Sequence, residues 1–316
     1  MKEANKITEG ALLTTIYIVL LMLIVFVPIL STIGLFILPI PFIIYAMKHG
    51  YQPAIVMFFV ALGLSMLFAT IVSLPVTLLS GLGGIVIGTS LHAKKKPYEV
   101  WANGSIGFIV AMIVVVLILQ FAFNINIYRE TQTYIEEVLS VTKKVFEQFN
   151  LSEQQLEQFA LIEEQMLSFP DLIPASIVIT SILIALGSMW LTFKIVNRIE
   201  KKKLAFPPFG EFSLPKFIIW IYLAFLIAVL FVEPNTIYSM MVLNAISILM
   251  MLVVIQGLSL AYFFARHKNL QNSVFVVTVI IAAILLPSIF MIVMQFLGII
   301  DLALDMKEKI ENAGGK

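Results

Sequence analysis

The side chains that most often perform chemistry are either absent from this chain or lie at the ends of its apolar runs. There is no cysteine, which excludes disulfides, thiolate catalysis and cysteine-ligated metals. The three histidines, His49, His92 and His267, lie near lysines in predicted loops, and the H-E-x-x-H spacing of a zinc protease is absent. The sequence also lacks the Walker A motif that cradles nucleotide phosphates. We therefore expect no enzyme activity, no metal and no cofactor.

Amide side chains inside or beside the apolar runs are the remaining candidates for a binding site. Gln120, Asn124 and Asn126 gather toward the end of one run, and three others stand alone in later runs, namely Asn244, Gln256 and Gln295. An amide in lipid needs a hydrogen-bond partner, which a neighbouring helix usually supplies. Structural hydrogen bonding is therefore the ordinary interpretation. Contact between a ligand and Gln120, Asn124 and Asn126 is the functional one.

The hydropathy of the chain indicates that these residues lie in or beside membrane-spanning helices. Its 316 residues are 60% hydrophobic and only 12% charged, with a mean hydropathy of +1.03, whereas soluble domains are about a quarter charged. Apolar runs of about 20 residues cross a bilayer as helices, because a helix satisfies its own backbone in lipid. The sequence predicts an all-α polytopic membrane protein with about nine transmembrane helices, at Ala11–Leu30, Thr32–Met47, Pro53–Val72, Leu74–Leu91, Ala102–Phe123, Leu172–Val196, Leu214–Val232, Thr236–Ala265 and Ser273–Ile300. The lipid bilayer is thus a partner, and the net charge of +1 gives no indication of nucleic-acid binding.

Three of these runs contain prolines or glycines that affect helix continuity or packing. Thr32–Met47 is short and contains Pro39 and Pro41, so we expect it to be kinked or broken. Pro287 interrupts Ser273–Ile300 and marks a kink or turn. The glycine-rich run Leu74–Leu91 contains a G-x-x-x-G motif formed by Gly84 and Gly88, which lets two helix backbones approach closely. We interpret this motif as packing within the protein, with contact to a partner as the alternative.

Lysine and arginine gather in alternate loops, as the positive-inside rule describes. With a cytoplasmic N-terminus and nine crossings, every short loop inside is basic and every short loop outside lacks Lys and Arg. The basic residues that then fall outside are Arg129, Lys143, Lys144, Lys307, Lys309 and Lys316. The sequence therefore predicts a multi-pass topology with a cytoplasmic N-terminus and an extracellular C-terminus.

A long polar and acidic segment, residues 124–171, separates two predicted spans. Apolar residues recur in it at helical spacing, first at Ile127, Thr131, Tyr134, Ile135, Val138, Val145 and Phe149, then at Leu156, Phe159, Ile162, Met166 and Phe169. Ser152 and Gln155 fit a capping box at the start of the second run. This pattern predicts an extracellular helical hairpin. Its apolar stripes could pack on each other, lie on the lipid surface or meet a partner, and mutual packing is the ordinary interpretation.

These segments divide the chain into five parts. We predict a six-helix membrane core at 1–123 and 172–196, the external hairpin at 124–171, a basic cytoplasmic linker at 197–213, a three-helix membrane part at 214–300 and an external polar tail at 301–316. The middles of the predicted spans contain no ionisable residue, which argues against an ion-coupled pump.

Short patterns at the helix ends resemble a known family. Thr8-Glu9-Gly10-Ala11-Leu12-Leu13 leads into the first helix, Leu38-Pro39-Ile40-Pro41-Phe42 precedes Lys48-His49-Gly50, and the glycine-rich helix runs into Lys94-Lys95-Lys96. Over most of the chain these patterns resemble the YybS-like (DUF2232) family of bacterial membrane proteins. Residues 11–196 are in turn similar to the substrate-binding S components of energy-coupling-factor (ECF) vitamin transporters.

The resemblance implies a bacterial plasma-membrane protein and suggests partners. S components bind a vitamin near the external face and couple to a membrane subunit with two ATPases, through an Ala-x-x-x-Ala on the first helix. The nearest match here is Ala11-x-x-x-Thr15. The YybS-like family suggests a different partner, a membrane-anchored phosphodiesterase.

Two functions are consistent with these observations. In the first, the core binds a small, largely uncharged or amphipathic ligand for transport or sensing. The pocket would open outward under the hairpin, with Asn124 and Asn126 as ligand contacts. In the second, the protein is a non-transporting scaffold or regulator, whose hairpin and Gly84/Gly88 face serve contacts with a partner protein.

Overall fold

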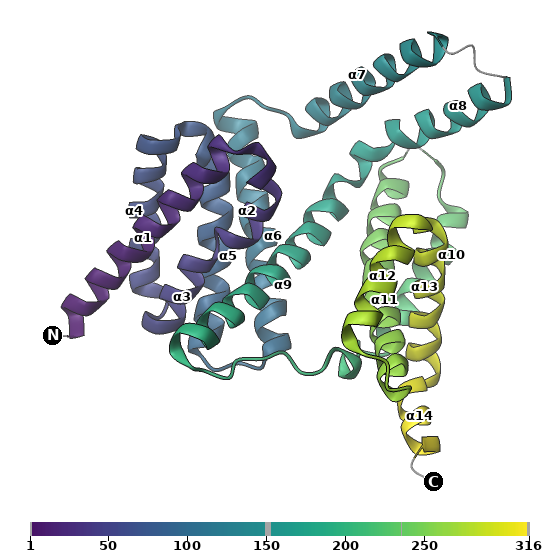
Figure 1. Ribbon diagram of the computed structural model, residues 1–316. Coiled ribbons are helices and arrows are strands. Elements are labelled where there is room, and N and C mark those ends of the chain that lie inside the picture. Colours follow the sequence, from purple (N-terminus) through teal and green to yellow (C-terminus); the bar gives the residue numbers. More distant parts are fainter. Residues whose placement is uncertain (1, 149–152, 235, 315–316) are drawn as a thin grey trace. The chain divides into compact units, whose positions relative to one another are not determined.

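The computed structural model describes residues 2–148, 153–234 and 236–314 (Figure 1), and within these ranges every regular element is a helix. Two apolar helices, Phe217–Phe231 and Asn272–Leu285, are short for a span. Eight others are long and apolar enough to cross a bilayer, at Ala4–Phe26, Ser31–His49, Tyr51–Ala69, Leu74–His92, Pro97–Ala122, Glu157–Glu200, Ile237–His267 and Pro287–Leu304. The prediction of an all-α polytopic membrane protein is therefore confirmed.

The chain divides into two compact units, Met1–Ala205 and Phe206–Lys316, and the division falls inside the segment 197–213 that we predicted as a linker. Unit 1 contains α1 (Lys2–Phe26), α2 (Ser31–Ile37), α3 (Ile40–His49), α4 (Tyr51–Ala69), α5 (Leu74–His92), α6 (Pro97–Ala122), α7 (Ile127–Gln148), α8 (Glu153–Leu167) and α9 (Ile173–Glu200). Unit 2 contains α10 (Phe217–Ala228), α11 (Ile237–His267), α12 (Asn272–Leu285), α13 (Pro287–Leu304) and α14 (Met306–Gly314).

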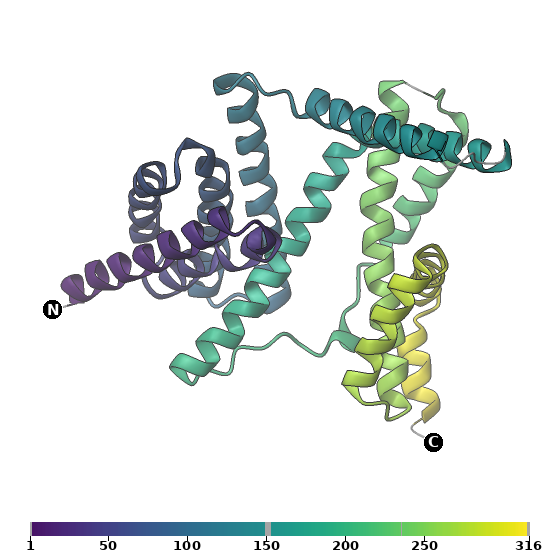
Figure 2. The same cartoon turned by 45° about the horizontal axis from the view of Figure 1, so that its top comes forward.

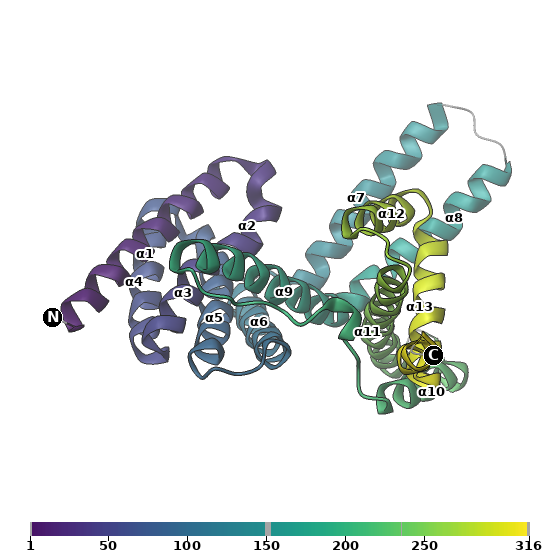
Figure 3. The same ribbon diagram turned by 60° about the horizontal axis from the view of Figure 1, so that its bottom comes forward.

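The second predicted span is broken at its prolines. α2 ends at Ile37 and α3 begins at Ile40, because Pro39 cannot donate the backbone hydrogen bond that would continue the helix. α3 then lies in the middle of unit 1, with α1, α4, α5 and α9 around it (Figure 3). Phe42 and Ile43 of α3 are fully buried, so this short helix forms the centre of the core.

Glycines on α5 allow the close packing of α3. A Cβ atom at Gly84 would press on the carbonyl of Pro39, and one at Gly88 would press on the carbonyl of Ile43. The two backbones approach each other directly, as in other helix pairs with small residues four apart. The Gly84/Gly88 face is therefore covered by α3 of the same chain.

The segment between α6 and α9 is a helical hairpin made of α7 and α8. Ile135 and Leu139 of α7 are buried against Phe159 of α8, and Phe146 meets Phe159 edge to face with ring centroids 5.1 Å apart. Mutual packing thus accounts for these members of the apolar pattern. Figure 2 shows α7 running across the end of α6 rather than continuing its direction.

Residues 149–152, between α7 and α8 in the chain, lie outside the described residues. Phe149 of the predicted apolar pattern and Ser152 of the predicted capping box are among them.

In unit 2, a pair of glycines brings α11 and α13 into backbone contact. Gly257 of α11 lies against the carbonyl of Met294, and Gly298 of α13 lies against the carbonyl of Val253. A Cβ atom at either glycine would overlap the facing oxygen. The contact leaves no room for any other residue type.

The predicted span Ser273–Ile300 is two helices rather than one. α12 ends at Leu285 and α13 begins at Pro287, whose ring disfavours a helical backbone at the residue before it. The chain reverses there, since the start of α12 at Asn272 bonds to Tyr262 near the end of α11, and α13 runs beside α11 back toward that same end. Figure 1 shows the reversal between α12 and α13.

This reversal bears on the predicted topology. Lys216, which follows the linker, forms an ion pair with Asp305 of the tail at 2.6 Å, and the Lys307 ammonium donates to the carbonyl of Phe212 at 2.6 Å. The end of the linker at Phe212 and the tail at Asp305 and Lys307 therefore lie at the same end of unit 2, whereas we expected them on opposite sides of the membrane because we counted the α12–α13 pair as one crossing. The side of the membrane that each terminus faces stays a prediction.

A tail on the same side of the membrane as the linker would also fit the charge distribution better. It would move Lys307 and Lys309 to the side of the basic linker. Arg129, Lys143 and Lys144 are then the basic residues left on the opposite side, as the positive-inside rule favours.

Candidate ligand-binding site

A cavity of about 820 Å³ lies between α4, α5 and α6 of unit 1. Its apolar walls include Phe58 and Phe59 from α4, Ile85 from α5, and Ile106 and Val110 from α6. Ligand sites are typically apolar hollows of 300–1,000 Å³ with a few polar groups that orient the ligand. This hollow, which we call the α4–α6 cavity, has both the size and the apolar lining of such a site.

One end of the α4–α6 cavity is polar because α5 and α6 are joined by a tight turn there. The turn places Ser90 of α5 opposite Asn103 of α6, and the amide of Asn103 donates to the Ser90 hydroxyl at 3.3 Å. Lys95 also lines this end and forms an ion pair with Glu99 at 2.8 Å. Thr89 lines it too, and its buried hydroxyl has no hydrogen-bond partner among the described residues. The cavity thus combines an apolar body with a hydroxyl, an amide and a cation.

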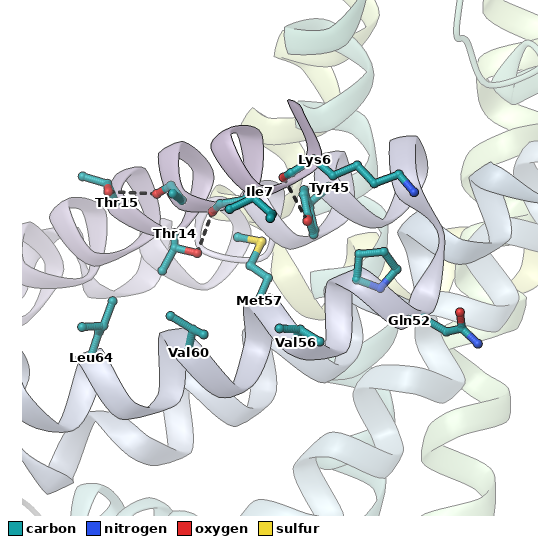
Figure 4. A pocket seen from close by; sticks show the side chains of 13 residues that line it. Lys6, Ile7, Thr14, Thr15, Tyr45, Gln52, Val56, Met57, Val60 and Leu64 are labelled. Atoms are coloured by element: carbon teal, nitrogen blue, oxygen red, sulfur yellow. Dashed lines mark hydrogen bonds between the residues drawn. The ribbon is translucent and has the colours of Figure 1, made fainter. Parts of the chain in front are cut away.

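A second hollow, the α1–α4 groove, lies on the other side of α4 and has a volume of about 650 Å³. Figure 4 shows Val56, Val60 and Leu64 of α4 facing Thr14 and Thr15 of α1 across it. Its polar end is formed by Lys6 and Gln52, and the small residues of its α1 wall are Gly10, Ala11, Thr14 and Thr15.

The hydroxyls in the α1–α4 groove are already satisfied. Thr14 donates to the carbonyl of Gly10 at 2.8 Å, and Thr15 donates to the carbonyl of Ala11 at 2.9 Å. Each bond stays within α1, so these hydroxyls have no proton left to donate to a ligand. Ala11 and Thr15, the pair that the family resemblance singled out, therefore present a small and apolar surface.

The amides that the sequence suggested as ligand contacts lie at the joint between α6 and α7. Gln120 is exposed near the end of α6, and Asn124 takes the left-handed backbone conformation, with φ of 56°, in the connection. Asn126 directly precedes α7, where its side-chain oxygen accepts from the backbone amide of Arg129 at 3.1 Å. Neither the α4–α6 cavity nor the α1–α4 groove includes Gln120, Asn124 or Asn126 in its lining.

Charged residues join three helices at the opposite end of unit 1 from the hairpin. Glu9 of α1 contacts the His49 ring at 2.7 Å and Lys48 at 3.4 Å, both from α3. Lys48 also pairs with Glu200 at the end of α9, at 2.9 Å. His49 is thus a structural partner of Glu9, whereas the sequence showed only that it lies near a lysine in a predicted loop.

Unit 2 contains a buried polar cluster that sequence reasoning missed. Asp301 of α13 is buried, and its carboxylate accepts from the Gln256 amide of α11 at 2.6 Å and lies 3.5 Å from the Lys307 ammonium. Lys307 also donates to Ser259 at 2.7 Å and to the carbonyl of Phe212 at 2.6 Å. We call these residues the Asp301 cluster.

Burial has the largest effect on the pKa of Lys307 in this cluster. Burial lowers the pKa of Lys307 below its ordinary value of 10.5, and the nearby Asp301 charge opposes this effect only in part. The Lys307 ammonium contacts oxygens of Phe212, Ser259 and Asp301, all in unit 2. These contacts hold the end of the linker, α11, α13 and α14 together.

The remaining amides of the apolar runs are also bonded within the chain. Gln295 donates to the Tyr222 hydroxyl, and Asn244 donates to the carbonyl of Met240 at 2.7 Å. These contacts are structural, as is usual for amides in lipid.

Comparison with known proteins assigns the chain to a family. A family model described as "Predicted membrane protein (DUF2232)" matches residues 15–302. The chain belongs to this family. A full-length relative from Bacillus subtilis (strain 168), named "Uncharacterized protein YybS", is 27% identical over 312 residues, which cover 98% of this chain and 100% of the relative. No solved structure matches the chain.

Membership of this DUF2232 family agrees with the membrane character of the fold. The matched range includes both units, and so it includes the α4–α6 cavity and most residues of the α1–α4 groove and the Asp301 cluster. The relative spans the same parts, the hairpin included. The description of the family and the name of the relative give no activity, so function rests on the chemistry of these sites.

Proposed function

We propose that unit 1 binds a small amphipathic ligand in the α4–α6 cavity, for transport or for sensing, and that the protein is not an enzyme. The observation that carries this proposal is the gathering of Ser90, Asn103 and Lys95 at one end of an otherwise apolar hollow. The apolar part of the ligand would lie between Phe58 and Ile106. Its head would accept hydrogen bonds from the Asn103 amide and the Lys95 ammonium.

The polar end of the α4–α6 cavity would lie at the membrane surface, which suits an amphipathic ligand. Lys95 belongs to the basic turn Lys94–Lys96, which the charge pattern places at the cytoplasmic surface. A head at that level stays in the polar interface while its tail reaches into the hydrocarbon region. The proposed pocket therefore differs from the outward pocket near Asn124 and Asn126 that the sequence suggested.

Adjacent residues on α4 provide a matched test. Ile55 lines the α4–α6 cavity and Val56 lines the α1–α4 groove, and both are exposed. Native mass spectrometry of the purified full-length protein would detect bound amphiphiles. A solvent extract of the same preparation would identify them. We expect Ile55→Trp, which fills the cavity, and Asn103→Leu to lose the bound molecule, while Val56→Trp retains it. Equal loading of all three variants would overturn the proposal.

A second candidate function is a contact with a membrane partner through the α1–α4 groove. Its α1 wall has two small and exposed residues, Ala11 and Thr15, at the spacing by which transmembrane helices approach each other. A coupling subunit with ATPases and a membrane-anchored phosphodiesterase are the two partners to look for. In a mild-detergent pull-down, Val56→Trp should release the partner and Ile55→Trp should keep it. Retention of the partner by both variants would exclude this groove as the contact.

We also propose that the protein lies in the bacterial plasma membrane with its N-terminus, linker and tail in the cytoplasm. The natural chain has no cysteine, so single cysteines report their side of the membrane without background. In intact cells an impermeant maleimide should label Lys143→Cys of the hairpin and spare Lys202→Cys of the linker. The reverse pattern would invert the topology.

A further inference from the structure

The hairpin carries a second apolar stripe that α8 does not cover. Tyr134, Val138, Val141 and Val145 lie on one face of α7 and are exposed, Tyr134 at 68% and Val141 at 60%. They are distinct from Ile135 and Leu139, which face α8. Residues spaced by four, three and four along a helix form the seam by which two helices pack in a coiled coil. We call these four residues the outer stripe.

The spacing of the outer stripe is symmetric about its centre. Reversing the order of the four residues gives the same intervals, so a second α7 running antiparallel can match the stripe with itself. Tyr134 then lies opposite Val145 of the second copy, and Val138 opposite Val141 of the second copy. Such a self-complementary surface is what a two-fold dimer requires.

The charges beside the outer stripe fit the same arrangement. Glu137 and Lys144 border the stripe on the edge away from α8, and both are exposed. In the antiparallel register each of them faces its opposite charge, because Glu137 of one copy meets Lys144 of the other, twice by symmetry. Within the described part of the chain neither residue forms an ion pair, so both are available for this contact.

The lipid surface suits this stripe less well. Amphipathic helices that lie on membranes present mainly lysine and arginine to the headgroups, whereas the polar residues of α7 are of mixed charge, with Glu130, Glu136 and Glu137 as well as Arg129, Lys143 and Lys144. Figure 2 shows that α7 runs to the side of the direction of α6, so two copies whose α6 helices cross one membrane could place their α7 helices side by side.

We propose that two copies of this chain associate through the outer stripe of α7, in an antiparallel pair that forms a four-helix bundle with both α8 helices. This inference is independent of the ligand and partner proposals, because it uses only hairpin residues.

Cysteine cross-linking in membranes tests the register. Two differently tagged full-length chains would be co-expressed, one with Val138→Cys and the other with Val141→Cys, in a protein that has no natural cysteine. We expect a strong disulfide-linked pair from this combination. We expect little cross-linking when both chains carry Tyr134→Cys, because antiparallel packing separates those two positions by about 16 Å along the axis. Efficient cross-linking of Tyr134→Cys with itself, or none at 138 and 141, would overturn the proposal.

Charge exchange tests the pairing. Glu137→Lys alone and Lys144→Glu alone each place two like charges across the seam, so each should lower the cross-linking yield about fivefold. The double exchange should restore the yield, which a change in folding could not do. Failure of the double variant to recover would exclude the proposed contact.

Other occupants of the outer stripe would give different results. A label at Val138→Cys that brominated lipids quench, without any cross-link, would show that the stripe lies on lipid. A label that is neither quenched nor cross-linked would show that neither lipid nor a second copy covers the stripe. Both outcomes would overturn the dimer.

Discussion

The α5–α6 contact of unit 1 and the α11–α13 contact of unit 2 both use glycine, but the glycines face different kinds of atom. Gly83 of α5 faces the ring of Phe108, and Gly107 of α6 faces the side chain of Val86. Gly257 and Gly298 of unit 2 face backbone carbonyls. A side chain can move when its neighbour grows, whereas the backbone of a helix cannot. The α5–α6 contact therefore meets side chains, whereas the α11–α13 contact meets helix backbone and is reinforced by buried polar groups.

The largest expected effect comes from adding a single methyl group to the rigid contact. Gly257→Ala would drive a Cβ atom into the carbonyl of Met294, so α11 and α13 would have to separate. We expect a loss of about 3 kcal/mol of stability, at the upper end of overpacking costs, measured by thermal unfolding in detergent.

Gly63→Ala is the matched control for this change. Nothing lies within 4 Å of a Cβ at Gly63, on α4. The variant should be neutral or slightly stabilising, because alanine favours a helix more than glycine does. Equal destabilisation by both substitutions would mean that the loss at Gly257 does not come from overlap with the Met294 carbonyl.

The next effect comes from the Asp301 cluster. Asp301→Ala removes the acceptor of the Gln256 amide and the counter-charge of Lys307, whose side chain is only 15% exposed. We expect a loss of about 2 kcal/mol, because buried donors are left unpaired. Adding Lys307→Met to Asp301→Ala should cost less than the two single changes together, since the uncompensated ammonium is gone. Additive losses in this cycle would mean that the two residues do not interact.

A smaller effect is expected from pH. The pKa of Lys307 is lower in the folded protein than its ordinary 10.5, so between those two values the unfolded chain binds more protons. Stability should therefore rise with pH across this window. The melting temperature of the wild type, relative to Lys307→Met, should increase between about pH 7 and about pH 10. A flat or falling difference would show that burial does not dominate the energetics of Lys307.

The smallest effect should come from an exposed ion pair in the hairpin. Lys143 pairs with Glu163 at 2.7 Å, with half of the lysine side chain exposed. Lys143→Ala should change stability by less than about 0.5 kcal/mol, as surface pairs usually do. A loss as large as that of Asp301→Ala would mean that exposure does not separate the two ion pairs.

Local patterns in the sequence predicted the elements that depend on neighbouring residues. The apolar runs predicted the membrane helices, Pro39 predicted the break between α2 and α3, and the three-four spacing predicted α7 and α8. These features are set by residues close together in the chain, where hydropathy, proline and helical spacing act directly.

Contacts between distant residues could not be predicted in the same way. Asp301 was placed in a polar tail, because its partner Gln256 lies 45 residues away and the apolar run stops just before it. The α4–α6 cavity likewise depends on three helices meeting. Gln120, Asn124 and Asn126 appeared functional because their neighbours are apolar, but the sequence could not show that neither hollow includes them in its lining. Pro287 marked a kink or turn, yet only the position of the tail shows that the chain reverses there.

The hydrogen bond between Lys307 and the linker has a consequence for the order in which unit 2 folds during synthesis. The ribosome makes Phe212 95 residues before Lys307, which at 5–20 residues per second is roughly 5 to 20 seconds. During that interval the Phe212 carbonyl and the Ser259 hydroxyl lack the ammonium that later joins them. The contacts of Lys307 with Phe212 and Ser259 can therefore form only after α13 has been synthesised and inserted. The last helices to be made thus determine when the linker and α11 are held in place.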